Sequence, residues 1–390
     1  MTFMCTANCI TCGRCAGTTI LDEFHTNNKH HTPREGAGIA VDVGTTTVVL
    51  ALVDLMAGEV LVRHSFMNPQ RAFGADVISR IDAATKGHLE ELTHLIITTI
   101  SEELTVLLTG GEVTSCQVVD MVIGCNTVMS HLLLGLPCQS LGVAPYKPAT
   151  TLESSYDSHD LFKSSGIDCP IRIMPWMGAY VGGDVTAGLI YLLPEEKNRF
   201  LLMDLGTNGE LALFNNGQLT VTATAAGSAF EQPVMATKER FQGASTVITA
   251  LANLVREGEI DEKGRLKTES IFTQSQVREL QLAKSAIRAG LDILLEQEQL
   301  SFDELEAVYL AGGIGQGVNV RDAIAIGIMP SELENKAFPI GNACLGGAVA
   351  FLQRPQQAGK DLERLLAEVK EVNLAASTSF SETFVKHLFF

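Results

Sequence analysis

Residues 41–54 read VDVGTTTVVLALVD, in which an aspartate and a glycine end one apolar strand and three threonines precede a second. Gly44 lets the backbone turn tightly and approach a ligand, because glycine has no Cβ. Asp42 is suited to hold Mg2+ through water beside a phosphate. The following residues offer N–H and hydroxyl donors to phosphate oxygens: Thr45, Thr46 and Thr47. The stretch therefore predicts either an ordinary glycine turn or a loop that binds phosphate.

The same plan recurs at residues 199–225, which read RFLLMDLGTNGELALFNNGQLTVTATA. Here too an apolar strand ends in an aspartate, Asp204, and is followed by a loop and two further strands, which indicates an internal duplication. The second loop offers Gly206, Thr207 and Asn208. Two such loops facing one another would clamp the β- and γ-phosphates of a nucleotide, so a pair of plain turns is the weaker interpretation. Helical patterns at 87–108 and 275–297 alternate with the strands and place the chain in the α/β class.

A third element lies at residues 307–330, AVYLAGGIGQGVNVRDAIAIGIMP. Its buried strand ends in Gly312 and Gly313, where a flat adenine or its ribose would lie against the backbone. A Gly-Gly pair alone is weak support, but its place after two phosphate loops resembles the order of elements in the actin, sugar kinase and Hsp70 superfamily. That resemblance implies two similar ribonuclease H-like subdomains around a nucleotide cleft.

A narrower resemblance connects the chain with the ATPase domain of reductive activators of corrinoid proteins. It covers residues 38–390 and rests on stretches that follow the family's order: GIAVDVGTTTVV (38–49), NPQRAFGADVISRI (68–81), IGCNTVMSHLLLG (123–135), DLGTNGE (204–210), QLAKSAIRAG (281–290), LAGGIGQGVNVRDAIAIGIMP (310–330), GNACLGGA (341–348) and VNLAASTSFSETFVKHLFF (372–390). The resemblance implies that ATP hydrolysis drives one electron onto the Co(II) form of a corrinoid methyl carrier. That step restores the carrier's methyl-accepting Co(I) state.

The resemblance also assigns roles to residues of this sequence. Asp42 would contact the metal, Asp204 would orient the attacking water or bind Mg2+ through water, and Glu231 would lie near the phosphates. ATP would be bound by the two loops and the Gly-Gly pair: Gly44, Thr45, Thr46, Thr47, Gly206, Thr207, Asn208, Gly312 and Gly313. The expected cofactors are ATP and Mg2+, and the expected partner is a corrinoid protein of a methyltransferase system. A homodimer is suggested by the resemblance alone.

Four cysteines lie within eleven residues near the N-terminus, with the spacing C-x3-C-x2-C-x2-C: Cys5, Cys9, Cys12 and Cys15. Well-characterised activators carry a ferredoxin domain, commonly of the [2Fe–2S] type, but the 36 residues before the ATPase unit are too few for that fold. The spacing favours a [4Fe–4S] cluster, because it is nearly the bacterial ferredoxin spacing reversed. Zinc is the alternative, and absence of a stable metal is a third. A separate electron donor would replace the cluster in the last two cases.

One segment departs from the family pattern. In AAGSAFEQPVMATKERFQGAST, residues 225–246, Ser228 and Gln232 stand where typical members have proline and glycine. Because of this departure, the sequence predicts the substrate or partner less firmly than it predicts ATP binding. Two alternatives therefore stay beside the leading interpretation: an ATP-driven electron donor that activates a radical dehydratase, and a small-molecule kinase on the same fold.

Composition limits the classes of partner. The chain has 390 residues, 46% of them hydrophobic, and a formal net charge of -17, which disfavours nucleic acid and anionic membranes. No apolar run is expected to reach the about 20 residues that span a bilayer, and no signal peptide is evident, so we expect a cytoplasmic protein. The predicted domains are a Cys-rich segment and linker (1–36), ATPase subdomain I (37–198), subdomain II (199–354) and a C-terminal helical extension (355–390).

Several residues admit a structural and a functional interpretation. A solvated helix cap and face, or else a partner or interlobe surface, is expected for Asn68, Gln70, Arg71, Asp76 and Arg80. His131 is predicted to lie in the core rather than to bind a metal, and Trp176 is predicted to pack in the core or between the lobes. The remaining five cysteines are predicted to be small buried hydrophobic residues: Cys116, Cys125, Cys138, Cys169 and Cys344. A third group either shapes the nucleotide cleft or permits close helix packing: Gly178, Gly182, Gly183 and Asp184.

Overall fold

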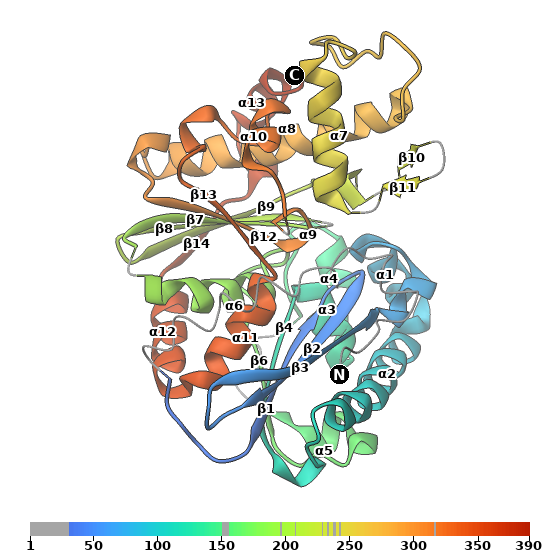
Figure 1. Ribbon diagram of the computed structural model, residues 1–390, viewed down its shortest axis with the longest axis vertical. Coiled ribbons are helices and arrows are strands. Elements are labelled where there is room, and N and C mark those ends of the chain that lie inside the picture. Colours follow the sequence, from blue (N-terminus) through green and yellow to red (C-terminus); the bar gives the residue numbers. More distant parts are fainter. Residues whose placement is uncertain are drawn as a thin grey trace. The chain divides into compact units, whose positions relative to one another are not determined.

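The computed structural model in Figure 1 describes most of the chain. The described residues are 31–149, 156–195, 197–206, 208–227, 229–231, 234–236, 239–241, 243–315 and 317–390, with the backbone alone at 231, 234–236 and 239–241. Two compact units are present. The N-terminal unit runs to Glu196 and includes Ala343–Ala367, and the C-terminal unit comprises Lys197–Asn342 and Glu368–Phe390.

The N-terminal unit is built on a six-stranded mixed sheet in the order β3-β2-β1-β4-β6-β5. A meander of three antiparallel strands comes first, and β4 and β6 then add in parallel beyond β1. The strands are β1 (Ala37–Val43), β2 (Thr47–Asp54), β3 (Glu59–Met67), β4 (Val118–Cys125), β5 (Tyr156–Asp157) and β6 (Pro170–Ile173). Apolar residues, many of them β-branched, make up most of β1 and β2, which fits strands that are buried along nearly their whole length.

Helices cover both faces of this sheet (Figure 1). One face carries α1 (Val77–Ala83), α2 (Leu89–Gly110), α3 (Thr127–Leu134) and α4 (Gln139–Gly142), and the other carries α6 (Gly183–Leu192), α11 (Ala343–Gln353) and α12 (Pro355–Ala367). The short α5 (Ser158–Leu161) follows β5. Helix α11 packs directly on α6, since a Cβ at Gly347 would lie 1.8 Å from the carbonyl oxygen of Ala187. The predicted boundaries placed residues 343–354 in ATPase subdomain II, whereas α11 packs within the N-terminal unit.

The predicted helix at 87–108 is confirmed as α2. By length and composition alone, the continuous helical stretch Val77–Gly110 is long and apolar enough to cross a membrane, contrary to the expectation that no run would be. Its apolar side instead packs in the core of the N-terminal unit, where Leu92, Ile96 and Ile100 meet the side chains of β1 and β2. This packing is typical of the core helix of a globular domain.

The C-terminal unit repeats the plan of the N-terminal unit. Its sheet has the order β13-β12-β7-β8-β9-β14, again with a three-stranded meander followed by two parallel strands. Its strands are β7 (Arg199–Leu205), β8 (Gly209–Asn215), β9 (Gln218–Thr224), β12 (Ala307–Ala311), β13 (Ala337–Gly341) and the edge strand β14 (Val369–Glu371), with a separate hairpin of β10 (Val234–Ala236) and β11 (Glu239–Phe241). The internal duplication predicted from the two Asp-Gly stretches is therefore confirmed.

The helices of the C-terminal unit are α7 (Ala244–Arg256), α8 (Gln274–Gln297), α9 (Gly312–Gly315), α10 (Val320–Ala325) and α13 (Phe380–Lys386). The long helix predicted at 275–297 is confirmed as α8, which begins with a capping box between Thr273 and Gln276. The last residues of the chain dock on α8. Buried Lys284 donates a hydrogen bond to the carbonyl of Phe389, and Ser285 donates one of 2.7 Å to the carbonyl of His387.

Candidate functional site

The first predicted phosphate loop, residues 44–46, connects β1 to β2 at the carboxyl end of β1. Asp42 is the last but one residue of β1 and is 7% exposed. The loop closes through a hydrogen bond of 3.0 Å from the amide of Gly44 to the carbonyl of Thr47. The predicted strand, turn and returning strand are therefore confirmed, and the loop stands beside a buried carboxylate.

Two side chains from distant parts of the sequence join Asp42. In the sheet register Asp42 is opposite Gly124 of β4, and a Cβ at Gly124 would lie 2.3 Å from Sγ of Cys344, so the thiol lies above this glycine. The Cys344 thiol donates a hydrogen bond to Asp42. Burial raises the pKa of Cys344 well above its usual value, with the Asp42 and Asp184 carboxylates adding to the shift. Cys344 is thus buried, as predicted, but it also bonds to a site residue.

Asp184 is the site residue whose role the sequence left open. Burial raises the pKa of its carboxyl to about 6, and the Asp42 carboxylate contributes to that shift. Asp184 lies in the first turn of α6, and two glycines let that end of the helix approach the sheet. A Cβ at Gly182 would lie 2.5 Å from Cα of Asn126, and one at Gly183 would lie 2.1 Å from the carbonyl oxygen of Met174. Close packing, one of the two interpretations, therefore brings Asp184 to Asp42, and a role in shaping the nucleotide cleft stays a prediction.

The pair of carboxylates fits Mg2+. Carboxylate oxygens are ligands that this cation prefers, and it is commonly bound by one or two carboxylates together with water and substrate phosphates. The described residues contain no cluster of three or more His, Cys, Asp or Glu side chains that could hold a metal. Asp42 and Asp184 would therefore bind Mg2+ only together with phosphate and water. Such an ion would neutralise phosphate charge and relieve the repulsion between the two carboxylates.

The second predicted loop repeats this arrangement in the C-terminal unit. Asp204 is the last but one residue of β7, and the amide of Gly206 donates a hydrogen bond of 2.9 Å to the carbonyl of Asn208. Gly312 has a φ of 75°, and a Cβ there would lie 2.3 Å from Oδ1 of Asp204. The structure therefore brings Asp204 and Gly312 together, as the proposed nucleotide site requires. Gly313 follows in α9 and is half-buried.

Two predicted site residues have no described side chain. Thr207 lies outside the described residues, and Glu231 ends a short 3-10 helix, Ala229–Glu231, of which only the backbone is described at that position. The four cysteines of the predicted metal cluster, Cys5, Cys9, Cys12 and Cys15, also lie outside the described residues. The roles of these six residues stay predictions.

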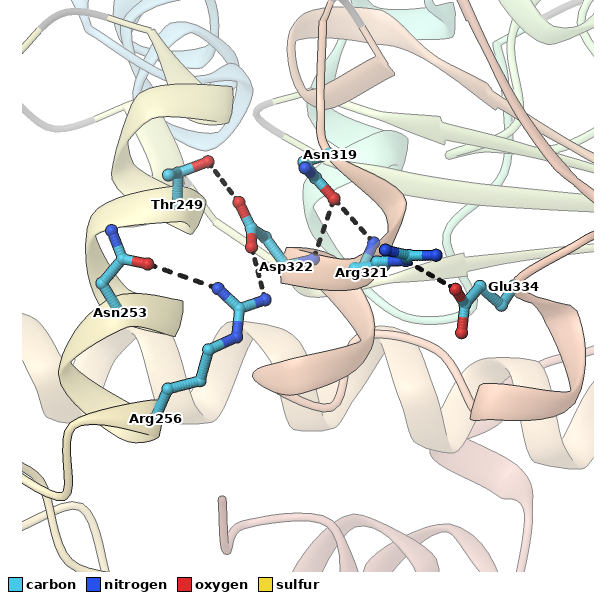
Figure 2. Close-up of polar contacts among 7 residues, drawn as sticks. All are labelled: Thr249, Asn253, Arg256, Asn319, Arg321, Asp322 and Glu334. Atoms are coloured by element: carbon cyan, nitrogen blue, oxygen red, sulfur yellow. Dashed lines mark hydrogen bonds and ion pairs between the residues drawn. The ribbon is translucent and has the colours of Figure 1, made fainter.

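A network of polar side chains, drawn in Figure 2, fixes α7 to α10. Asp322, 4% exposed, accepts hydrogen bonds from Thr249 at 2.6 Å and from Arg256 at 2.5 Å. Arg256 is also within 3.3 Å of the Asn253 side chain. Asn319 caps α10 through the amides of Arg321 and Asp322. Because α7 also packs on α9, this network supports the turn at which Gly312 meets Asp204.

The segment NPQRAFGADVISRI corrects a prediction. Asn68 and Gln70 are 1% exposed and Arg80 is fully buried, so the expectation of a solvated surface is wrong for these three. Asp76 does cap α1, as expected, by accepting a hydrogen bond of 2.8 Å from the amide of Ser79. The reason for the burial is tertiary: Asn68 and Arg80 donate to carbonyls of the first loop, far upstream in the sequence.

The remaining structural predictions are mostly confirmed. His131 is fully buried, is within 2.7 Å of the carbonyl of Thr127 through Nδ1, and accepts from the amide of Ala149 at 3.1 Å through Nε2. Burial lowers its pKa, and its ring packs against half-buried Trp176. Four of the five scattered cysteines are buried. Cys116 is exposed, because it lies in the turn before β4, and its predicted burial is wrong.

Models of known families match nearly the whole ATPase region. Residues 37–193 match the RACo middle region, and residues 198–240 and 261–390 match the C-terminal domain of RACo, the ASKHA domain. The chain belongs to the RACo family. RACo denotes reductive activators of corrinoid proteins, so both the predicted superfamily fold and the narrower family resemblance are confirmed.

Individual relatives agree with this assignment. The chain is 30% identical to the corrinoid activation enzyme RamQ of Eubacterium limosum, over 96% of this chain and 73% of that protein. It is 23% identical to a [Co(II) methylated amine-specific corrinoid protein] reductase of Methanosarcina barkeri, over 79% of this chain and 68% of that one. A solved structure titled reductive activator for corrinoid, iron-sulfur protein matches with a TM-score of 0.80 and 29% identity, over 92% of this chain and 67% of that one.

Proposed function

We propose that this chain is an ATP-hydrolysing activator that drives one electron onto the Co(II) form of a corrinoid methyl-transfer protein. The observation that carries the proposal is the repeated Asp-Gly loop of a RACo family member. In each unit an aspartate lies one residue before the end of the first strand, beside a glycine loop: Asp42 with Gly44, and Asp204 with Gly206. This arrangement supports binding of nucleotide phosphates and Mg2+.

The proposed reaction consists of two coupled conversions. ATP and water give ADP, phosphate and a proton, while one electron leaves a low-potential donor and reduces Co(II) to Co(I). Asp42 and Asp184 would hold Mg2+ with water, and Asp204 would orient the attacking water or bind Mg2+ through water. A protein that hydrolyses ATP can shift between conformations, and such a two-state element is what an energetically uphill electron transfer requires.

The proposal also concerns the group that donates the electron. We propose that Cys5, Cys9, Cys12 and Cys15 hold an iron–sulfur cluster, with zinc as the alternative ligand of the same four thiolates. A corrinoid protein of a methyltransferase system is the proposed partner, supported by the similarity to the corrinoid protein reductase of Methanosarcina barkeri. The chain would act in the cytoplasm.

The test is reduction of a Co(II) corrinoid protein under anaerobic conditions, followed through the absorption of Co(II) and Co(I). We expect Co(I) to accumulate with ATP, Mg2+ and a reductant, and not with ADP. Asp42→Ala and Asp204→Ala should abolish both this reduction and ATP hydrolysis, whereas Asp157→Asn, a change at an exposed helix cap, should preserve them. ATP-independent Co(I) formation, or full activity of both alanine variants, would contradict the proposal.

A second measurement tests the donor. Iron, sulfide and zinc are determined per chain after anaerobic purification, together with the visible spectrum before and after dithionite. Iron and sulfide that bleach on reduction and disappear in Cys9→Ser and Cys12→Ser would support the cluster. Zinc, or no metal, would overturn that part and leave a separate electron donor.

A further inference from the structure

Three consecutive carbonyls of the first loop are held from the protein side. Asn68 donates from Nδ2 to the carbonyl of Gly44 at 2.8 Å and from its own amide to that of Thr46 at 3.0 Å. Arg80 donates from Nη2 to the carbonyl of Thr45 at 2.6 Å. Both donors belong to the segment between β3 and the end of α1, so one segment fixes the direction of all three peptide groups.

Because the peptide bond is planar, the direction of these carbonyls also fixes the direction of the amides on the opposite side of the loop. In a trans peptide the C=O of one residue and the N–H of the next point in opposite directions. The carbonyls of Gly44, Thr45 and Thr46 point toward the segment 68–80. The amides of Thr45, Thr46 and Thr47 therefore point away from it. Successive amides on one side of a loop are the groups from which anion-binding concavities are built.

The Thr45 hydroxyl is oriented in a similar way. Asn126 donates from Nδ2 to Oγ1 of Thr45 at 3.1 Å, so the hydroxyl oxygen acts as acceptor there. Its proton must then point toward another acceptor. The Asn126 carbonyl oxygen at the same time accepts from the amide of Met129, which caps α3 and fixes the Asn126 side chain. A phosphate oxygen beside the loop would receive this hydroxyl donor.

Arg80 also brings a buried positive charge. Its side chain is fully buried, donates to the carbonyl of Gly74 at 3.1 Å and contacts Sδ of Met129 at 3.2 Å, so these contacts are with neutral groups. Burial lowers its pKa to about 10, with Arg71 as a second cause and the Asp76 carboxylate acting in the opposite direction, and the guanidinium stays charged near pH 7. Because Arg80 donates its hydrogen bonds to neutral groups, the Asp76 carboxylate offsets its charge only in part, and the remaining positive field favours an anion on the other side of the loop.

We propose that Arg80 and Asn68 are positioning residues that hold the first loop in its anion-binding form, and that the buried Arg80 charge strengthens its hold on the nucleotide phosphates. The inference rests on the proposed binding of ATP. Arg80 does not reach the nucleotide itself in this proposal; it acts through the carbonyl of Thr45. Its effect is therefore specific to ligands that carry phosphate.

The test compares affinities by isothermal titration calorimetry with ATP and ADP, and by competition with adenosine, which has no phosphate. Arg80→Gln removes the charge, and Arg80→Lys keeps it with fewer donors. We expect Arg80→Gln to weaken ATP and ADP binding about tenfold or more, since a hydrogen bond to a charged group is involved, and to leave adenosine affinity unchanged. Arg80→Lys should recover part of the loss.

Arg354→Gln is the matched control. Arg354 is another buried arginine of the N-terminal unit, 5% exposed, which donates to the carbonyl of Ile190 and pairs with Asp361 at 2.8 Å. Its variant should lose thermal stability without a change in nucleotide affinity. Equal affinities of wild type and Arg80→Gln for ATP, or an equal loss of adenosine affinity, would overturn the inference. If Arg80→Gln does not fold, Asn68→Ala supplies the same comparison. Failure of the wild type to bind ATP would instead refute the proposed function.

Discussion

Replacement of Gly312 by alanine tests the contact between the Gly-Gly turn and Asp204. A residue with a Cβ at a φ of 75° costs about 1–2 kcal/mol of stability in the left-handed region. The added Cβ would also lie 2.3 Å from Oδ1 of Asp204 and 2.9 Å from the backbone of Leu205. Carbon contacts normally begin near 3.5 Å, so the Asp204 carboxylate must move by about 1 Å.

That displacement determines the expected kinetics. A misplacement of about 1 Å at a reacting group costs about a hundredfold in rate, so Gly312→Ala should hydrolyse ATP about a hundred times more slowly than the wild type. Gly317→Ala is the matched control, because Gly317 has a φ of 77° and a Cβ there would meet nothing within 4 Å. It should lose a similar amount of stability from the backbone alone and keep its ATPase rate.

Both quantities are measurable on the same preparations. Urea unfolding gives the free energy of unfolding, and steady-state ATP hydrolysis gives kcat and KM. The reasoning is refuted if Gly312→Ala hydrolyses ATP as fast as Gly317→Ala while both variants are folded. A rate loss of equal size in both variants would likewise show that the Asp204 contact is not the cause.

Three further predictions concern buried polar groups. Burial, with Arg288 as the second cause, lowers the pKa of Lys284 from 10.5 to about 8. Because the unfolded chain then binds the proton more tightly than the folded chain, the free energy of unfolding should rise between pH 8 and pH 10, and urea titrations should show no such rise for Lys284→Met. Asp322→Ala should lower the free energy of unfolding by about 2 kcal/mol, because it removes the buried carboxylate that accepts hydrogen bonds from Thr249 and Arg256. Arg321→Ala, at an arginine whose side chain is 79% exposed, should cost less than about 1 kcal/mol in the same assay. Cys344→Ala should raise the Mg2+ concentration for half-maximal ATPase activity about tenfold, and Cys344→Ser should not, since serine can still donate a hydrogen bond to the Asp42 carboxylate. Equal Mg2+ concentrations for the two variants would show that this hydrogen bond does not support Mg2+ binding.

The local parts of the fold were predictable from the sequence. An apolar run that ends in aspartate and glycine specifies its strand and turn through neighbouring residues, so the loops after Asp42 and Asp204 were found at their observed positions. The same holds for α2 and α8, whose apolar residues recur with a helical period. Repetition of one local pattern was then enough to predict two similar units.

The surroundings of the loops were not predictable in this way, because they depend on contacts between distant parts of the chain. Arg80 and Asn68 lie in a polar segment whose spacing is that of a solvated helix start, and only the carbonyls of the first loop explain their burial. Cys344 is separated from Asp42 by about three hundred residues, and a single cysteine in apolar sequence carries no local sign of a partner. The one available sign for Asp184 was its position directly after two glycines, which indicated close packing.

The duplication places the two aspartates in equivalent positions but gives them different neighbours. Asp42 is opposite Gly124 of the parallel strand β4, and Asp204 is opposite Ala311 of the parallel strand β12. Each aspartate therefore lies next to the first parallel strand of its own sheet. In the N-terminal unit the helices that follow bring a thiol and a second carboxylate to the aspartate. In the C-terminal unit the adjacent strand continues directly into Gly312, whose backbone lies close to the Asp204 carboxylate, and buried Glu210 is opposite Asp204 on β8. A second carboxylate therefore accompanies each aspartate, from α6 in the N-terminal unit and from the paired strand in the C-terminal unit. The equivalent strands determine where the two aspartates stand, and the segments packed against them determine which groups surround each one.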